Sequence, residues 1–233
     1  RIGEIMSLLK IMLLISPVLA VVAYNNLSTA IIILGIAVCM LFVASPKYLQ
    51  FIIMGIGVGL AGTLFILLAS YRAERVMIWL HPEDYEKGYQ TLQGLYAIGS
   101  GGLFGRGLGN SVQKLGFLPE AQNDMIFSII CEELGLIGAG FIILLFLILI
   151  WRFFVISTKA SDLLGALIAA GAMAHMMIQV ILNIAVVTNS IPNTGITLPF
   201  ISYGGTSVVF LLLEMGLVLS VSNYEGLRYG GSE

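Results

Sequence analysis

Charged side chains are scarce in this chain of 233 residues. Asp, Glu, Lys and Arg together make up 10% of it, whereas a soluble globular protein carries about 25%. Hydrophobic residues make up 58%, and the mean hydropathy is +1.00. A single soluble core could not bury so much apolar surface, which excludes an ordinary soluble domain. The net charge of −2 offers no basic excess, so nucleic acid is excluded as a partner. The composition predicts an all-α polytopic membrane protein that contacts membrane lipids.

Cysteine is almost absent as well, with two residues in the whole chain. Cys39 and Cys131 lie far apart in the sequence, each within an apolar run. This placement favours two small packing residues over a disulfide or a metal site. We therefore predict no metal-binding residues.

Apolar runs dominate what is present. A helix needs about 20 residues to cross roughly 30 Å of hydrocarbon, and six segments reach or approach this length: 6–24, 29–45, 49–70, 136–156, 162–187 and 206–222. The sequence predicts one membrane domain over residues 1–233 with about six transmembrane helices. The chain opens without a methionine, and we expect it to begin inside a longer protein.

The short connections carry the orientation signal. Lys47 follows the second predicted span, Arg152 lies near the end of the fourth, and Lys159 follows the fourth. Since Lys and Arg in short loops favour the cytoplasmic side, that side is predicted to be cytoplasmic. The long segment 71–135 and the segment 188–205 then face outward as extracytoplasmic loops. Within the first, residues 91–100 are weakly apolar and predict a short interfacial helix.

Residues 101–135 concentrate the polar groups of the chain. The run GSGGLFGRGLG (99–109) holds six glycines, which permit positive φ angles and a close approach of the backbone to a ligand. A flexible re-entrant turn is an equal alternative. Asp124 stands just before an apolar run, at the predicted boundary between water and membrane. A carboxylate placed there is either functional or the N-cap of the following helix.

Two long motifs resemble a known family. Residues 88–135 read GYQTLQGLYAIGSGGLFGRGLGNSVQKLGFLPEAQNDMIFSIICEELG, and residues 193–207 read NTGITLPFISYGGTS. They resemble the two large extracellular loops of the SEDS family, whose members are FtsW, RodA and SpoVE. The resemblance extends over about residues 25–224. Family members typically have ten spans, and this chain resembles the last six, so the resemblance implies a fragment of a ten-span protein.

The resemblance implies a peptidoglycan glycosyltransferase that polymerises lipid II during cell division, elongation or sporulation. It also implies the bacterial cytoplasmic (inner) membrane as the location. The implied partners are a class B penicillin-binding protein and other divisome or elongasome membrane proteins. The family's catalytic motif usually reads Glu-Ala-His-Thr-Asp-Phe, and here residues 120–125 read Glu-Ala-Gln-Asn-Asp-Met. The aspartate is kept, which maps the catalytic role onto Asp124, while the neighbouring details differ.

The implied reaction assigns roles to further residues. An acceptor hydroxyl needs a base, for which Asp124 is suited. The leaving pyrophosphate needs a cation or a divalent metal ion, and it departs as a stable anion, so no acid is required. Lys114 and Arg106 are the first candidates for the pyrophosphate, with attraction to lipid headgroups as the alternative. Arg72 is a weaker candidate, and Glu120 could orient Lys114 or Asp124 or form a surface salt bridge.

Polar residues inside the later spans are also candidates. His175, Gln179 and Asn183 share one helical stripe because they are four residues apart. Gln179 and Asn183 either line a groove for lipid II or form interhelical hydrogen bonds. Ser202, in the second motif, either contacts the substrate or packs the loop.

Two other function classes compete with the polymerase, a lipid II flippase and a non-catalytic scaffold of the cell-wall synthesis complex. A flippase needs charges along a path across the membrane, and Glu214, an isolated charge in the last span, would then relay protons. A polymerase needs an outward carboxylate instead. The second and third predicted spans have no ionisable residue in their apolar interiors, which favours the polymerase.

Overall fold

A computed structural model describes residues 5–45, 47, 49, 51, 55 and 70–229, without the side chains of residues 5, 7, 70–74 and 224–229. Every regular element among these residues is a helix. Five helices are long and apolar enough to cross a membrane: α1 (Ile5–Asn25), α2 (Leu27–Ala44), α6 (Ile126–Lys159), α7 (Leu163–Val187) and α8 (Gly205–Tyr229). They confirm the all-α polytopic fold and five of the six predicted spans. The predicted third span, 49–70, lies almost wholly outside the described residues.

The chain divides into two compact units. The first comprises Arg1–Gly59, Ile148–Ile178 and Val208–Glu233, and the second comprises Leu60–Leu147 and Gln179–Ser207. Helices α6, α7 and α8 each contribute residues to both.

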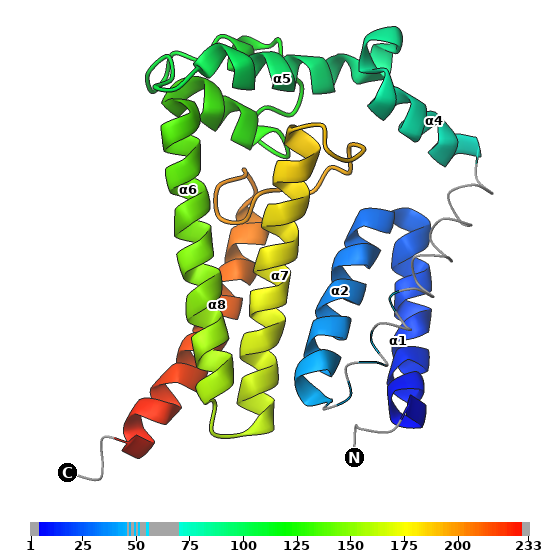
Figure 1. The fold of residues 1–233 in the computed structure, drawn as a ribbon, viewed down its shortest axis with the longest axis vertical. Coiled ribbons are helices and arrows are strands. Elements are labelled where there is room, and N and C mark those ends of the chain that lie inside the picture. Colours follow the sequence, from blue (N-terminus) through cyan, green and yellow to red (C-terminus); the bar gives the residue numbers. More distant parts are fainter. Residues whose placement is uncertain are drawn as a thin grey trace. The chain divides into compact units, whose positions relative to one another are not determined.

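Among its described residues, the first unit contains the whole of α1 and α2 and parts of α6, α7 and α8. Helices α1 and α2 pack side by side, and Asn26 between them caps α2 by accepting a hydrogen bond from the Thr29 amide at 3.2 Å (Figure 1). Two polar contacts join the other helices of this unit. The Ser157 hydroxyl donates to the Ala166 carbonyl at 2.9 Å, and His175 Nδ1 on α7 lies 2.9 Å from Glu214 Oε2 on α8. The sequence left interhelical hydrogen bonds open as the role of the polar stripe on α7, and the His175–Glu214 pair is such a contact.

The second unit holds most of the polar residues. Its elements are α4 (Ser70–Leu80), the short 3₁₀ helices η1 (Pro82–Asp84) and η2 (Glu86–Gly88), α5 (Tyr89–Gly101) and the 3₁₀ helix η3 (Gln113–Leu115). The first part of α6, the last part of α7 and the irregular segment 188–204 complete it. The predicted helix over 91–100 is confirmed as α5.

The start of α6 differs from the prediction. The predicted span began at 136, whereas the helix begins at Ile126 and bends at Gly135, where φ is +69° and ψ is −172°. Only a glycine adopts this conformation readily. A short helical piece, 126–134, therefore precedes the bend, and it carries the two glutamates, Glu132 and Glu133, that the sequence placed at the end of the long loop.

Candidate active site

Asp124 lies in the turn that leads into α6, two residues before the helix begins. Its side chain is buried, with 7% of its surface exposed, and Met125 and Phe127 beside it are buried in the core. The Oδ1 atom of Asp124 is buried and has no hydrogen-bond partner among the described residues. An unpartnered carboxylate oxygen in a buried place is costly, so this atom is a candidate for contact with a ligand.

The backbone around Asp124 is held by α7. Asn183 is fully buried, and its Nδ2 donates to the carbonyl of Asp124 and to the carbonyl of Ile196, each at 2.7 Å. One side chain thereby joins α7 to the turn of Asp124 and to the segment 188–204. Both amide hydrogens of Asn183 are used on the main chain, whereas its Oδ1 is buried without a hydrogen-bond partner among the described residues. The predicted substrate contact of Asn183 stays a prediction.

A second side chain fixes the same turn. The Ser202 hydroxyl donates to the Asn123 carbonyl at 2.7 Å and accepts from the Leu198 amide at 2.7 Å. The Tyr203 amide donates to the Gln122 carbonyl at 2.8 Å. Ser202 is buried, so its position agrees with the packing role that the sequence left open beside substrate contact.

A cavity of about 380 Å³ opens beside Asp124, entirely within the second unit. Its lining combines two cations, two carboxylates and several neutral polar groups: Arg75, Ile78, Trp79, Lys87, Gln90, Thr91, Glu120, Asp124, Asn189, Asn193, Thr194 and Gly195. The hydroxyl oxygen of Thr194 is buried and has no hydrogen-bond partner among the described residues. The cavity thus offers cations for an anion and polar atoms for a ligand with hydroxyl groups.

The cavity wall is built from segments far apart in the sequence. Trp79 Nε1 donates to the Asn189 carbonyl at 2.9 Å, and Asn189 Nδ2 donates back to the Trp79 carbonyl at 3.3 Å. Asn193 Nδ2 donates to Gln90 Oε1 at 3.0 Å. Asn189 has a φ of +54°, a left-handed conformation that asparagine tolerates better than most residues. These contacts join α4 and α5 to the segment that follows α7.

Burial raises the pKa of Asp124 above its usual range. The negative charge of nearby Glu120 raises it further, while hydrogen bonding by the backbone amides of Asp124 and Met125 lowers it. The carboxylate is therefore a stronger base than an exposed aspartate, which suits proton removal from a hydroxyl group.

Lys114 and Arg106 do not line this cavity. Lys114 Nζ lies 2.6 Å from Glu133 Oε1, and Arg106 Nη1 lies 3.4 Å from Glu132 Oε1. Lys114 lines a neighbouring pocket, which shares Glu120 with the Asp124 cavity. The predicted contact of Lys114 and Arg106 with the pyrophosphate stays a prediction. Among the described side chains, the cations that line the cavity are Arg75 and Lys87. Lys87 stands beside Glu86 and close to Asp84 in the sequence, a pattern typical of a solvated charge.

Three other predicted site residues have different places. The side chain of Arg72 lies outside the described part of the chain. Gln179 is half-buried on α7 and is not among the residues that line the cavity. Glu120 lines the cavity and accepts a hydrogen bond from the side-chain amide of Asn123. Lys114 is paired with Glu133, and the orienting role of Glu120 toward Asp124 stays a prediction. No sequence pattern distinguished the cavity residues Trp79, Asn189 and Asn193, because hydrogen bonds between distant segments place them.

The glycine run approaches the first part of α6. Four of its glycines have positive φ: Gly102, Gly105, Gly107 and Gly109. The amides of Arg106 and Gly107 donate to the carbonyls of Glu132 and Glu133, each at 2.9 Å. A Cβ atom on Gly105 would collide with the Glu133 carbonyl. The run is thus a tight loop docked on the bend of α6, and the prediction of positive φ angles is confirmed.

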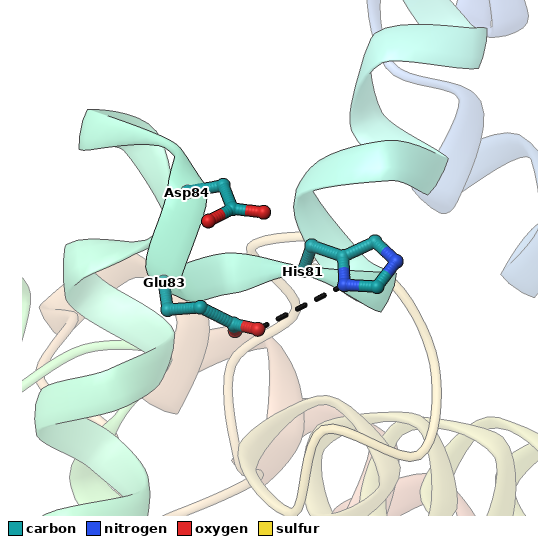
Figure 2. Close-up of side chains that lie close together, drawn as sticks. All are labelled: His81, Glu83 and Asp84. Atoms are coloured by element: carbon teal, nitrogen blue, oxygen red, sulfur yellow. Dashed lines mark ion pairs between the residues drawn. The ribbon is translucent and has the colours of Figure 1, made fainter.

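One group of side chains has a donor set that suits a metal ion. His81, Glu83 and Asp84 offer ligand atoms that all lie within 4.8 Å of one another, and His81 Nδ1 is 3.8 Å from Glu83 Oε1 (Figure 2). All three are exposed, and none of them lines the Asp124 cavity. Exposed groups of this kind are common without an ion, so we assign the group no role.

Comparison with known proteins adds an independent finding. A family model described as "Cell cycle protein", covering FtsW, RodA and SpoVE, matches residues 3–226. Stage V sporulation protein E of Bacillus subtilis is 45% identical over 212 residues, which cover 90% of this chain and 58% of that protein. The probable peptidoglycan glycosyltransferase FtsW of Coxiella burnetii is 38% identical over 225 residues, covering 94% of this chain and 60% of that protein. The chain thus spans less than two thirds of these relatives.

Solved structures share the fold. A chain from a structure described as "Structural coordination of polymerization and crosslinking by a peptidoglycan synthase complex" superposes with a TM-score of 0.72 and 25% identity, over 93% of this chain and 62% of that one. A crystal structure of a mutant of the rod shape determining protein RodA from Thermus thermophilus gives a TM-score of 0.59 and 26% identity, over 89% and 53%.

Proposed function

Because this chain belongs to the cell cycle protein family of FtsW, RodA and SpoVE, we propose that it is a peptidoglycan glycosyltransferase that polymerises lipid II into glycan strands. The observation that carries the proposal is the buried carboxylate of Asp124, which has an unpartnered oxygen and lines a cavity together with Arg75 and Lys87. The names of the relatives point to the same chemistry. The cavity supplies a base and cations side by side, as a transfer from a sugar pyrophosphate requires.

Asp124 acts as the general base in this proposal. It takes the proton of an acceptor sugar hydroxyl while the hydroxyl oxygen bonds to the anomeric carbon of the donor sugar. The bond from that carbon to the pyrophosphate oxygen breaks, and the pyrophosphate leaves with the electron pair. Arg75 and Lys87 face the negative charge that grows on the leaving group. Lys114 and Arg106, bound to glutamates at the start of α6, have a structural role in this arrangement.

The test of the proposal is a lipid II polymerisation assay with the intact protein in liposomes. Asp124→Asn keeps the size of the side chain and removes the base, so the rate should fall by about 10²–10⁴. Asp84→Asn, at an exposed carboxylate that does not line the cavity, is the matched control and should keep the rate. Near-normal polymerisation by the Asp124→Asn protein would exclude Asp124 as the base.

Location and orientation belong to the same proposal. We place the protein in the bacterial cytoplasmic membrane with Asp124 and the segment 188–205 facing outward, on the basis of the short-loop charges at Lys47, Arg152 and Lys159. Single cysteines at positions 84 and 159, in a chain without Cys39 and Cys131, test the orientation with an impermeant thiol reagent on intact cells. Position 84 should react and position 159 should not, and the reverse pattern would invert the topology.

The proposed protein partner is a class B penicillin-binding protein, the transpeptidase that crosslinks the strands. The similar fold in a structure described as a peptidoglycan synthase complex supports this partner. Co-purification of the intact protein with each such transpeptidase of its own cell would identify the partner. If none of them co-purifies, the polymerase acts without a stable transpeptidase.

A further inference from the structure

The loop between α5 and α6 exposes large apolar side chains that the proposed reaction does not use. The exposed fractions are 59% for Leu103, 80% for Phe104, 76% for Leu108 and 75% for Leu115. An exposed Phe and three exposed Leu residues within thirteen positions are unusual for a loop in water. We call these four residues the apolar loop surface.

The loop that carries the apolar loop surface is hydrogen-bonded to α6 just after the bend at Gly135. The amide of Leu136 donates to the Gly102 carbonyl at 2.9 Å, and the amide of Ile137 donates to the Leu103 carbonyl at 3.2 Å. Leu136 and Ile137 open the apolar part of α6 and are themselves exposed, at 66% and 59%. In Figure 1 the loop that follows α5 lies against the bend of α6. The exposed side chains of the loop therefore lie at the same position along the axis of α6 as Leu136 and Ile137.

The length of α6 sets that height relative to the hydrocarbon. Between Glu133 and Arg152 the helix has no charged residue. Counted from the bend at Gly135, residues 136–151 span roughly 24 Å at about 1.5 Å per residue, which is less than the hydrocarbon thickness of about 30 Å. The whole stretch is thus needed to cross the membrane. Leu136 and Ile137 must then lie inside the hydrocarbon or at its edge, and Leu103 lies beside them.

The charges of the loop are arranged to match this depth. Lys114 is paired with Glu133 at 2.6 Å, and Arg106 with Glu132 at 3.4 Å. Glu133 also accepts from the amides of Gly109 and Ser111, at 3.0 and 3.3 Å. Both cations and much of the backbone of the loop are thus neutralised or hydrogen-bonded within the protein, which lowers the energy needed to bring the loop into a membrane surface.

From this we infer that the apolar loop surface is inserted into the membrane, so that the occupant of this surface is lipid. The loop that carries the apolar loop surface then lies in the interfacial region of the membrane and anchors the second unit to the lipid. The inference is independent of the proposed reaction and of which side of the membrane the loop faces. It commits to lipid over a protein partner because the surface continues the apolar face of α6.

Spin labels measure the depth directly. Single cysteines at positions 104 and 108, in the intact protein without Cys39 and Cys131, are labelled with a nitroxide in phosphatidylglycerol–phosphatidylethanolamine liposomes. Position 145, an exposed leucine on α6, is the lipid reference, and position 84 is the water reference. At 104 and 108 we expect collisions with oxygen to exceed collisions with a water-soluble nickel chelate, as at 145. Dominance of the nickel chelate at both positions, as at 84, would overturn the inference.

A second measurement covers the case in which a labelled protein fails to fold. Phe104→Trp keeps an aromatic ring, and its fluorescence is compared with that of the unmodified protein, which contains Trp79 and Trp151. Brominated lipids should quench the added fluorescence of Phe104→Trp strongly. Absence of that quenching would contradict lipid insertion. Absence of lipid quenching, together with a blue shift of the added emission of Phe104→Trp that arises only after a transpeptidase is added, would assign the surface to a protein partner instead.

Discussion

The side-chain amide of Asn183 donates to the main-chain carbonyl of Asp124 at 2.7 Å, and it holds the Ile196 carbonyl at the same distance. Asn183 comes from α7, so a residue of a long apolar helix sets the position of the candidate base. Its buried amide fixes the backbone of Asp124, and the carboxylate itself stays available to the cavity. The polar stripe of α7 thus acts on the site through the main chain.

Asn183→Ala should destabilise the protein and misplace Asp124. The change leaves two buried carbonyl groups without their donor, each worth about 1–3 kcal/mol. We expect a lower temperature of thermal unfolding in detergent and a lower kcat in lipid II polymerisation. Ile181→Ala, at an exposed position of the same helix, is the control and should have little effect on either. A loss confined to KM would indicate direct substrate binding by Asn183.

Two glycines of the loop allow a matched comparison. Gly105 and Gly109 both have positive φ, of +75° and +81°. An alanine at 105 would place its Cβ against the Glu133 carbonyl, whereas an alanine at 109 has nothing within 4 Å. Gly109→Ala should therefore show only the left-handed strain, about 1–2 kcal/mol, and Gly105→Ala should lower the unfolding temperature much more. Equal losses would mean that the loop is not docked on α6.

The sequence was sufficient for the class of fold, and it singled out the candidate base. Apolar runs of membrane length predict helices whether or not anything packs beside them, because the backbone must satisfy its own hydrogen bonds in lipid. Asp124 could be found because its motif is local, six adjacent residues. Positive φ angles in the glycine run were predictable for the same reason, since they depend on the residue type at each position.

The cations of the site could not be found in this way. Lys87 stands beside Glu86 and close to Asp84 in the sequence, which gives it the appearance of a solvated charge, whereas Lys114 follows the glycine run with no acidic residue beside it. Their different places follow from tertiary contacts, the ion pair of Lys114 with Glu133 and the hydrogen bonds that join Trp79 to Asn189. The start of α6 at Ile126 was not predictable from hydropathy, because the short helical piece before the bend at Gly135 contains two glutamates.

Lys87 should matter more to the reaction than Lys114. Lys87 lines the Asp124 cavity, whereas Lys114 is bound to Glu133 outside it. If Lys87 meets the charge of the leaving pyrophosphate, Lys87→Ala should lower kcat by about 10²–10³. Lys114→Ala removes a partly exposed ion pair worth about 0–1 kcal/mol and should change kcat little. Steady-state rates at saturating lipid II give kcat for the two variants. A larger loss of kcat in Lys114→Ala would identify Lys114 as the residue that contacts the pyrophosphate.

The His175–Glu214 pair should be replaceable as a unit. Either His175→Leu or Glu214→Leu leaves a polar group without its partner between α7 and α8, at an expected cost of about 1–3 kcal/mol. The double variant removes both groups and should be at least as stable as either single variant. Thermal unfolding of the four proteins measures the coupling, and additive losses would show that the pair contributes nothing. Normal polymerisation by the double variant would also exclude a proton-relay role for Glu214.

The pH profile of polymerisation should report the raised pKa of Asp124. A general base works as the carboxylate, so the rate falls when the pH drops through its pKa. Because burial raises that pKa, the acid limb of kcat/KM should lie above the pH of about 3.9 at which an ordinary aspartate titrates. The same shift favours the protonated form in the folded state. The stability contributed by this group is therefore lost as the pH rises from the ordinary pKa through the raised one.

Glu120→Gln tests the cause of that shift. The charge of Glu120 contributes to the raised pKa of Asp124, so its removal should move the acid limb to lower pH. Glutamine keeps an oxygen that can accept the hydrogen bond from the side chain of Asn123. Glu83→Gln is the control, because Glu83 is an exposed carboxylate that does not line the cavity. It should leave the pH of the acid limb unchanged. The position of the acid limb is read from kcat/KM measured between about pH 4 and about pH 8. This range begins near the ordinary aspartate pKa of about 3.9 and extends beyond the ordinary histidine pKa of about 6.5. A limb that stays in place in Glu120→Gln would show that burial alone sets the pKa, and a limb that moves equally in both variants would assign it to a general surface charge.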